Sequence, residues 1–120
     1  MRLGELTLEG NGEAVYATVR GEIDLSNAEA LRRELTSGIC NDASGLVLDL
    51  SEVDYVDSAG LHLIHHLRED LRARGQRLGL VIPDKSVIHD VLRLAGIDWD
   101  KDIAPTVDAA RRMLESPPDA

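Results

Sequence analysis

The residues best suited to chemistry lie in the run 54–60, whose sequence is DYVDSAG. An apolar segment precedes this run and an amphipathic segment follows it, so we expect Asp57 or Ser58 at the N-cap or in the first turn of a helix. Both residue types are preferred helix caps, and capping is one interpretation. The other is that Ser58 accepts a phosphoryl group, because helix N-termini bind anions and phosphoserine adds about −1.5 to −2 charges there.

The sequence argues against Ser58 as the nucleophile of an enzyme. The nucleophile elbow of hydrolases needs glycine two residues before and two residues after the serine, but position 56 is Val while Gly60 fits. A Ser–His–Asp arrangement needs a positioned base, and no pattern brings His89 to Ser58. The sequence has neither a P-loop nor a dinucleotide-binding glycine motif, so we expect no cofactor, and ATP for phosphorylating Ser58 must come with another protein.

Histidines and a lone cysteine are the other candidates for chemistry. His62 and His66 are four residues apart, a spacing that metal sites use, with His65 between them. No third ligand group accompanies them and position 63 is Leu where a zincin has Glu, so we expect surface histidines beside an apolar stripe and no metal site. Cys40 has no basic neighbour in sequence, which indicates a small buried or half-buried filler rather than a reactive thiol.

Hydrophobic periodicity predicts the elements that must position Ser58. The segment 46–50 is apolar throughout, which is typical of a strand buried on both faces, and the loop 51–57 follows it. Ser26 and Glu29 fit a capping box that starts a helix with Ala30, Leu31 and Leu35 on its apolar side. The pattern predicts further strands at 3–9, 15–19 and 78–82, a short last strand within 97–103 and a hairpin turn at 11–12. It predicts helices that end at 38, 74 and 96, the third of which opens at Pro83, and a last helix over 106–114 that is capped by Thr106 or Asp108.

This order of elements predicts one α/β domain over residues 1–115 with a disordered C-terminal tail over 116–120. We expect a mixed, mostly parallel β-sheet with an N-terminal antiparallel hairpin and about four helices packed on it. Function in such sheets gathers beyond the carboxyl ends of the strands, where the loops 21–27 and 51–58 are expected to meet. Asp24 lies in the first of these loops, where a plain solvated carboxylate is an equally good interpretation.

Charge and hydropathy exclude several classes of partner. The 120 residues include 22 acidic and 13 basic side chains, a net charge of −9 that repels nucleic acid. No segment approaches the roughly 20 apolar residues of a membrane span, so we expect no membrane insertion. The first residues lack a signal-peptide run and Cys40 has no partner for a disulfide, which together indicate a cytoplasmic protein.

Two segments together resemble the STAS domain family. Residues 21–28 (GEIDLSNA) look like the Gly-x-(Ile/Leu)-Asp stretch after the second strand of STAS domains. Residues 48–61 (LDLSEVDYVDSAGL) resemble the family's most diagnostic segment, which includes Asp-Ser-x-Gly-Leu. The likeness covers roughly residues 5–113, and stand-alone domains of this length resemble bacterial anti-sigma factor antagonists.

The resemblance implies a switch at Ser58. An unphosphorylated Ser58 lets such a domain bind an anti-sigma factor with serine-kinase activity, and a sigma factor is freed. The kinase then phosphorylates Ser58 and breaks the complex, and a metal-dependent serine phosphatase reverses the step. The resemblance also implies that the partner-binding surface includes Asp24 and Ser26 from the first motif and Asp57, Ser58 and Gly60 from the second.

Two alternatives stay open. STAS domains are also subunits of lipid-transport ATPase complexes, in which the key hydroxyl need not be phosphorylated. Gly60 either lets a kinase backbone approach closely or relieves the packing of its helix against the sheet.

Overall fold

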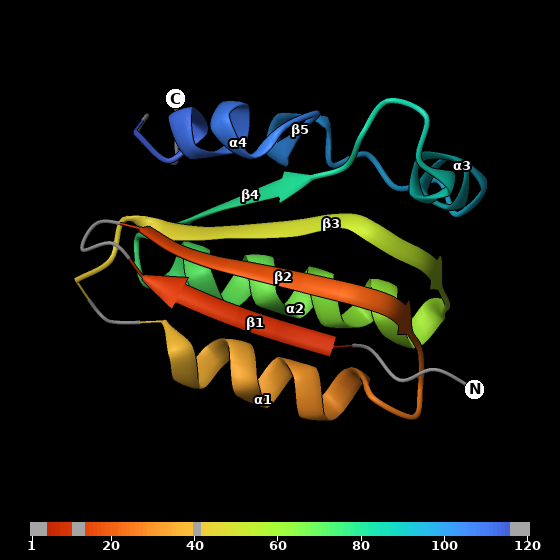
Figure 1. Cartoon of the computed structure of the whole chain (residues 1–120), viewed down its shortest axis with the longest axis horizontal. Coiled ribbons are helices and arrows are strands. Elements are labelled where there is room, and N and C mark those ends of the chain that lie inside the picture. The colour runs from red at the N-terminus through yellow and green to blue at the C-terminus, as the bar shows by residue number, and fades with distance from the viewer. Residues whose placement is uncertain (1–4, 11–13, 40–41, 116–120) are drawn as a thin grey trace.

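The computed structural model describes residues 5–10, 14–39 and 42–115. Their strands form one sheet in the order β1-β2-β3-β4-β5 (Figure 1), with β1 antiparallel to β2 and the other neighbours parallel. The elements are β1 (Glu5–Gly10), β2 (Ala14–Ile23), α1 (Ala28–Gly38), β3 (Gly45–Val56), α2 (Ser58–Ala73), β4 (Arg77–Val81), α3 (Val87–Leu94), the 3-10 turn η1 (Asp100–Asp102), β5 (Ile103–Ala104) and α4 (Val107–Met113). The predicted α/β class, with a mostly parallel sheet and four helices in the described residues, is confirmed.

Some predictions fall on residues that the structure does not describe. These are the hairpin turn at 11–12, the environment of Cys40 and the C-terminal tail at 116–120. No helix in the described ranges is both long enough and apolar enough to cross a membrane.

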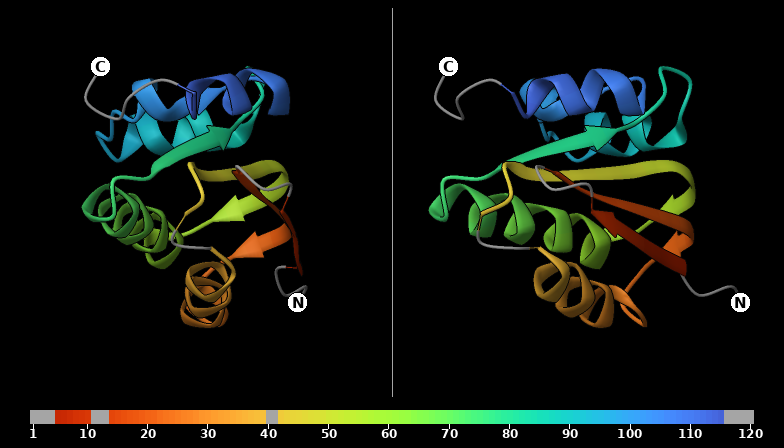
Figure 2. Two further views of the ribbon diagram at one scale, coloured as in Figure 1. Left: turned by 90° about the vertical axis from the view of Figure 1, so that its left-hand side faces the viewer. Right: turned by 60° about the vertical axis from the view of Figure 1, so that its left-hand side comes forward.

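Buried side chains form two clusters, one on each face of the sheet. The larger cluster joins the strands to α1, α2 and α3 and includes Leu48, Ile64 and Ile88. The smaller one joins Val47 of β3 to Ala110 of α4 on the opposite face. Because neighbouring strand residues point to opposite faces, the burial of both Val47 and Leu48, each 1% exposed, confirms that this strand is covered on both sides. Figure 2 shows α1 and α2 lying along the same side of the sheet.

Helix α2, which begins at Ser58, is held along its length. Its predicted apolar stripe is buried, with Ile64, Leu67 and Leu71 each 1% exposed. Near its middle, Arg68 pairs with Asp102 at 2.7 Å, where the two side chains are 21% and 15% exposed. The Arg68 guanidinium also lies 5.2 Å from the centroid of the Trp99 ring, a cation–π distance. These contacts join α2 to the segment that contains Trp99 and Asp102.

The predicted loop at 51–57 is wrong, because β3 continues to Val56. Strand β2 likewise runs past residue 19 to Ile23, and the two strands stay paired up to Ile23 and Val56. The pairing has two register shifts, one on each side of Arg20 and Gly21, and at each of them β3 carries one extra residue. Gly21 has a φ of 92° between the two shifts. Only Asp57 then separates β3 from α2.

The helix ends were predicted better than the helix starts. Gly75 and Gly96 follow α2 and α3 with φ of 72° and 70°, the left-handed conformation that ends helices. Of the two predicted caps of α4, Thr106 is the one observed, since its hydroxyl accepts a hydrogen bond from the Ala109 N–H. The third helix begins at Val87 rather than near Pro83, because Ser86 provides its N-cap.

Candidate functional site

Ser58 is the first residue of α2, and Asp57 is its N-cap. The Asp57 Oδ1 atom accepts a hydrogen bond from the Gly60 N–H over 3.0 Å. The Asp57 N–H donates to the Ile23 carbonyl over 3.2 Å, so the cap is tied to the end of β2. Ser58 is exposed, and within the described ranges its hydroxyl makes no hydrogen bond. Asp57 therefore does the capping, and the Ser58 hydroxyl is left to solvent.

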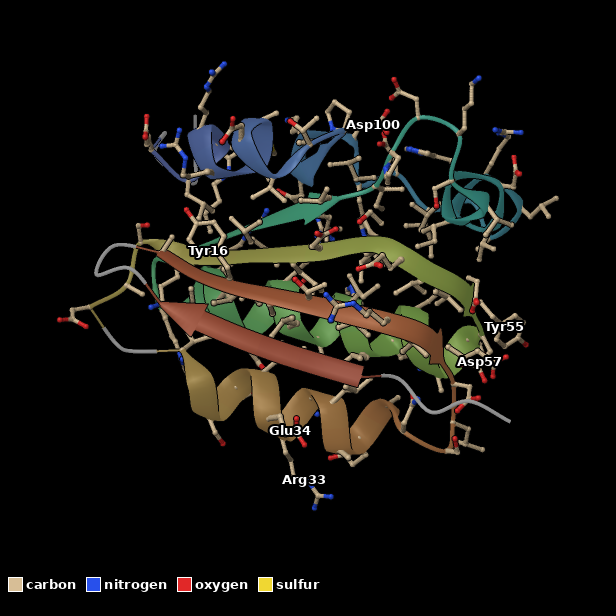
Figure 3. All side chains as sticks on the ribbon, viewed as in Figure 1. Tyr16, Arg33, Glu34, Tyr55, Asp57 and Asp100 are labelled. Carbon is tan, nitrogen blue, oxygen red and sulfur yellow. The ribbon has the colours of Figure 1, made fainter. Side chains whose placement is uncertain are left out.

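The turn between β2 and α1 meets this helix start, as the sequence predicted. The Asp57 Oδ2 atom accepts a hydrogen bond from the Leu25 N–H over 3.1 Å. Asp24 is half-buried, and its Oδ1 atom accepts hydrogen bonds from both the main-chain N–H and the hydroxyl of Ser26. Asp24, Ser26, Asp57 and Ser58 thus gather at the carboxyl ends of β2 and β3, the end at which Figure 3 places Asp57 and Tyr55.

The predicted capping box at Ser26 is wrong, and a residue that the sequence analysis overlooked explains why. Asn27, only 7% exposed, donates from Nδ2 to the Glu22 carbonyl over 2.8 Å and accepts from the Asp24 N–H over 3.0 Å. Its amide therefore holds the turn, and no side chain caps α1. The predicted apolar side of this helix also changes, since Ala28 is buried and Ala30 is exposed. The only signal for Asn27 was its residue type directly before a helix.

Gly60 lies beneath the site rather than on its surface. A Cβ atom at this position would lie 2.7 Å from Val56 Cγ1 and 2.9 Å from the Ile23 carbonyl oxygen. Contacts this short would force the neighbouring atoms, including main-chain atoms of Ile23, to move. Glycine is therefore needed for α2 to approach the ends of β2 and β3 this closely. Of the two roles considered for Gly60, the structure supports packing.

Two open hollows flank the start of α2 and share Leu25 as a wall. A shallow depression is lined by Glu22, Asp24, Leu25, Ser26, Tyr55 and Asp57. A groove between α1 and α2 is lined by Leu25, Ala28, Glu29, Arg32, Ala59, His62, Leu63 and His66. Leu25 is 83% exposed and Tyr55 51% exposed. Exposed apolar side chains rimmed by charged ones are typical of a surface that binds another protein.

The histidines of α2 are surface residues, as predicted. His62, His65 and His66 are all exposed. The ring centroids of His62 and His66 lie 6.4 Å apart. In the part of the chain that the structure describes, no three His, Cys, Asp or Glu side chains are grouped so as to hold a metal ion.

Sequence comparison identifies the family of this chain and two similar proteins. The model of the STAS domain family matches residues 5–110. Osmosensory protein A of Mycobacterium tuberculosis is 38% identical over 68 residues, which are 57% of this chain and 42% of that protein. Anti-sigma-F factor antagonist RsfB of the same species is 33% identical over 88 residues, covering 73% of this chain and 70% of RsfB.

Solved structures show the same fold. The crystal structure of an anti-sigma factor antagonist from Mycobacterium paratuberculosis superposes with a TM-score of 0.80 at 25% identity, over 95% of this chain and 96% of that one. The agreement extends over almost the whole of both chains. By contrast, this chain spans less than half the length of Osmosensory protein A.

Proposed function

This chain belongs to the STAS domain family, and we propose that it is an anti-sigma factor antagonist. In this role it sequesters an anti-sigma factor while Ser58 is unphosphorylated, and a sigma factor is thereby freed. The relative RsfB, which carries that description and aligns over 73% of this chain, supports the proposal. The single observation that carries it is the exposed Ser58 hydroxyl at the first position of α2, with the capping left to Asp57.

The site suits Ser58 as the substrate of a kinase. The γ-phosphoryl group of ATP is transferred to Ser58 Oγ, the hydroxyl proton goes to a base of the kinase, and ADP leaves. Because the Ser58 hydroxyl makes no hydrogen bond among the described residues, no hydrogen bond of the fold must break for the transfer. A phosphatase restores the serine when water attacks the phosphorus, the bond from phosphorus to Ser58 Oγ breaks, Oγ takes up a proton, and inorganic phosphate is released.

Phosphorylation would weaken the complex through charge and desolvation rather than refolding. Phosphoserine adds about −1.5 to −2 charges to a surface that already holds Asp24 and Asp57. The exposed side chains of Leu25 and Tyr55 lie in the same area, and they favour an apolar partner surface. Burying a phosphate against such a surface costs several kcal/mol unless it is paired.

The proposed partners follow from this role. They are an anti-sigma factor with serine-kinase activity and a metal-dependent serine phosphatase. Because a sigma factor acts in the cytoplasm, we propose that this protein acts there too. Asp24, Ser26, Asp57 and Ser58 are proposed to line the docking surface, with Gly60 supporting it from below. The domain is proposed to extend over residues 1–115. The alternative of a lipid-transport subunit gains nothing from the relatives reported above.

Mapping the phosphoryl group tests the proposal. The protein is incubated with its cognate anti-sigma kinase and ATP, and the product is analysed by mass spectrometry. We expect one phosphoryl group per chain, located on Ser58 and lost in Ser58→Ala. Ser37→Ala, which removes an exposed hydroxyl in the last turn of α1 away from the docking surface, serves as the control and should be labelled normally. A phosphoryl group on any other residue would overturn the assignment of Ser58.

A further inference from the structure

We propose that His62 binds the phosphate of phosphoserine 58, so that the switch depends on pH as well as on phosphorylation. The inference rests on the proposed function, because it assumes that Ser58 carries a phosphomonoester. It concerns the His62 side chain, which phosphorylation of Ser58 does not itself require.

The geometry of α2 brings the two side chains together. Ser58 and His62 are both exposed and lie four residues apart, so they occupy adjacent turns of one helix face. Cβ atoms at this spacing are about 5–6 Å apart. Helical side chains lean toward the helix N-terminus, so the His62 imidazole covers the turn that Ser58 begins. A phosphate on Ser58 Oγ extends the reach of that residue and comes within hydrogen-bonding range of the ring.

The charged groups around His62 leave it available to the phosphate. From α1, Glu29 and Arg32 line the same groove as His62 and His66. Arg32 is directed to Asp70 of α2 at 3.4 Å. Glu29 is therefore the competing carboxylate, and it is a monoanion opposite a phosphate that approaches two charges.

The other neighbours of His62 are two histidines, an uncharged leucine and a carboxylate that is already hydrogen-bonded. His66 continues the row one turn further, with its ring centroid 6.4 Å from that of His62. His65 contacts His66, with ring centroids 5.7 Å apart. The β2–α1 turn faces the groove with Leu25, which is uncharged. The Asp57 carboxylate is occupied by the N–H groups of Gly60 and Leu25.

Imidazole and phosphomonoester groups in general change charge over the same range of pH. An ordinary imidazole gains its proton near pH 6.5, and phosphoserine loses its second proton near pH 6. Imidazolium and the phosphate dianion therefore coexist between about pH 6 and 7, where each stabilises the other. In this range the pair offsets part of the added negative charge. The phosphorylated protein should then recover part of its affinity for the anti-sigma factor as the pH falls below 7.

A phosphorus NMR titration tests the pairing without any partner protein. Phosphoserine is installed at position 58 during translation, and the phosphorus chemical shift is followed from pH 4.5 to 8.5. Because imidazolium favours the dianion, we expect the phosphate of the otherwise unmodified chain to titrate at a lower pH than in His62→Gln. The expected difference is roughly 0.15–0.4 pH units, the size typical of a charged pair on adjacent helix turns.

A control variant and a contrary outcome complete the test. His65→Gln is the matched control, because residue 65 lies two turns from Ser58, about 10 Å along the helix, and this variant should titrate like the parent. If His62→Gln and the parent share one midpoint, the pairing is wrong. The titration midpoint does not depend on the kinase, because phosphoserine is installed during translation. If the anti-sigma kinase failed to modify Ser58, the proposed function would be wrong, but the result of the titration would still stand.

Discussion

The carboxylate of Asp57 accepts a hydrogen bond from the main-chain N–H of Leu25, 32 residues earlier, over 3.1 Å. Its other oxygen caps α2 through the Gly60 N–H. One side chain therefore joins the β2–α1 turn to the helix that begins with Ser58. Because Leu25 is 83% exposed, this bond also holds an apolar side chain beside the proposed phosphorylation site. The apolar and the modifiable parts of the surface are positioned by the same carboxylate.

Replacing Asp57 should destabilise the fold as well as the site. Asp57→Ala removes the acceptor for two main-chain N–H groups, and we expect the free energy of unfolding in urea to fall by about 1–3 kcal/mol. Asp54→Ala is the matched control, since Asp54 is exposed near the same end of β3, and it should change stability by less than about 0.5 kcal/mol. Equal losses in the two variants would show that the bonds made by Asp57 contribute nothing.

Gly60→Ala should be destabilising although alanine is the better helix former. The added methyl group would meet Val56 Cγ1 at 2.7 Å and the Ile23 carbonyl at 2.9 Å. Relieving such overlaps typically costs about 1–3 kcal/mol, which exceeds the gain of about 1 kcal/mol in helix propensity. Chemical denaturation measures the change, with Ser58→Ala as the control, because Ser58 lies two residues earlier in the same helix and is exposed. A stabilised Gly60→Ala protein would contradict the close approach of α2 to β2 and β3.

Asn27 and Ser26 give opposite expectations for the start of α1. Asn27→Ala breaks bonds to Glu22 and Asp24 in a buried position, and we expect the free energy of unfolding to fall by about 1–3 kcal/mol. Ser26→Ala removes only an exposed hydroxyl and should cost less than about 0.5 kcal/mol. A larger loss for Ser26→Ala than for Asn27→Ala would restore the capping box and refute the observed turn.

Leu25 should matter for partner binding and not for folding. Leu25→Ser removes an 83% exposed side chain that lines both hollows, so the unfolding free energy should change by less than about 0.5 kcal/mol. Affinity for the anti-sigma factor, measured by titration calorimetry, should fall about tenfold or more. Leu94→Ser is the matched control, because Leu94 is 89% exposed on α3 and lines neither hollow. Equal affinities of the two variants would place the partner elsewhere.

The sequence predicted the placement of Ser58 because the signals for it are local. A buried apolar strand, a cap-forming Asp and a stripe at helical spacing all lie within residues 46–74, and each holds in the structure. The length of β3 was missed for a physical reason. In its second half the buried residues Leu50, Val53 and Val56 recur every third position instead of every second, because β3 carries one extra residue at each of two register shifts against β2. This spacing does not match the two-residue period of a regular strand, so the segment was predicted as a loop.

The details of the site depend on contacts between distant residues. Ser26 and Glu29 match a capping box, but tertiary bonds from Asn27 to Glu22 and Asp24 take precedence over that local option. The bond between Asp57 and Leu25 joins two segments far apart in the chain, and no local pattern encodes it. The role of Gly60 was left between two alternatives because only the packed positions of Ile23 and Val56 decide it.

The dissociation constant of the complex between this protein and its anti-sigma factor tests the central claim most directly. It is measured at pH 8, where imidazoles are neutral, with serine or phosphoserine installed at position 58. Phosphoserine at Ser37, exposed in the last turn of α1 away from the site, controls for added charge alone. We predict that phosphoserine at position 58 weakens binding at least about tenfold, or 1.4 kcal/mol, while phosphoserine at position 37 leaves it nearly unchanged. Equal dissociation constants for serine and phosphoserine at position 58 would contradict the account.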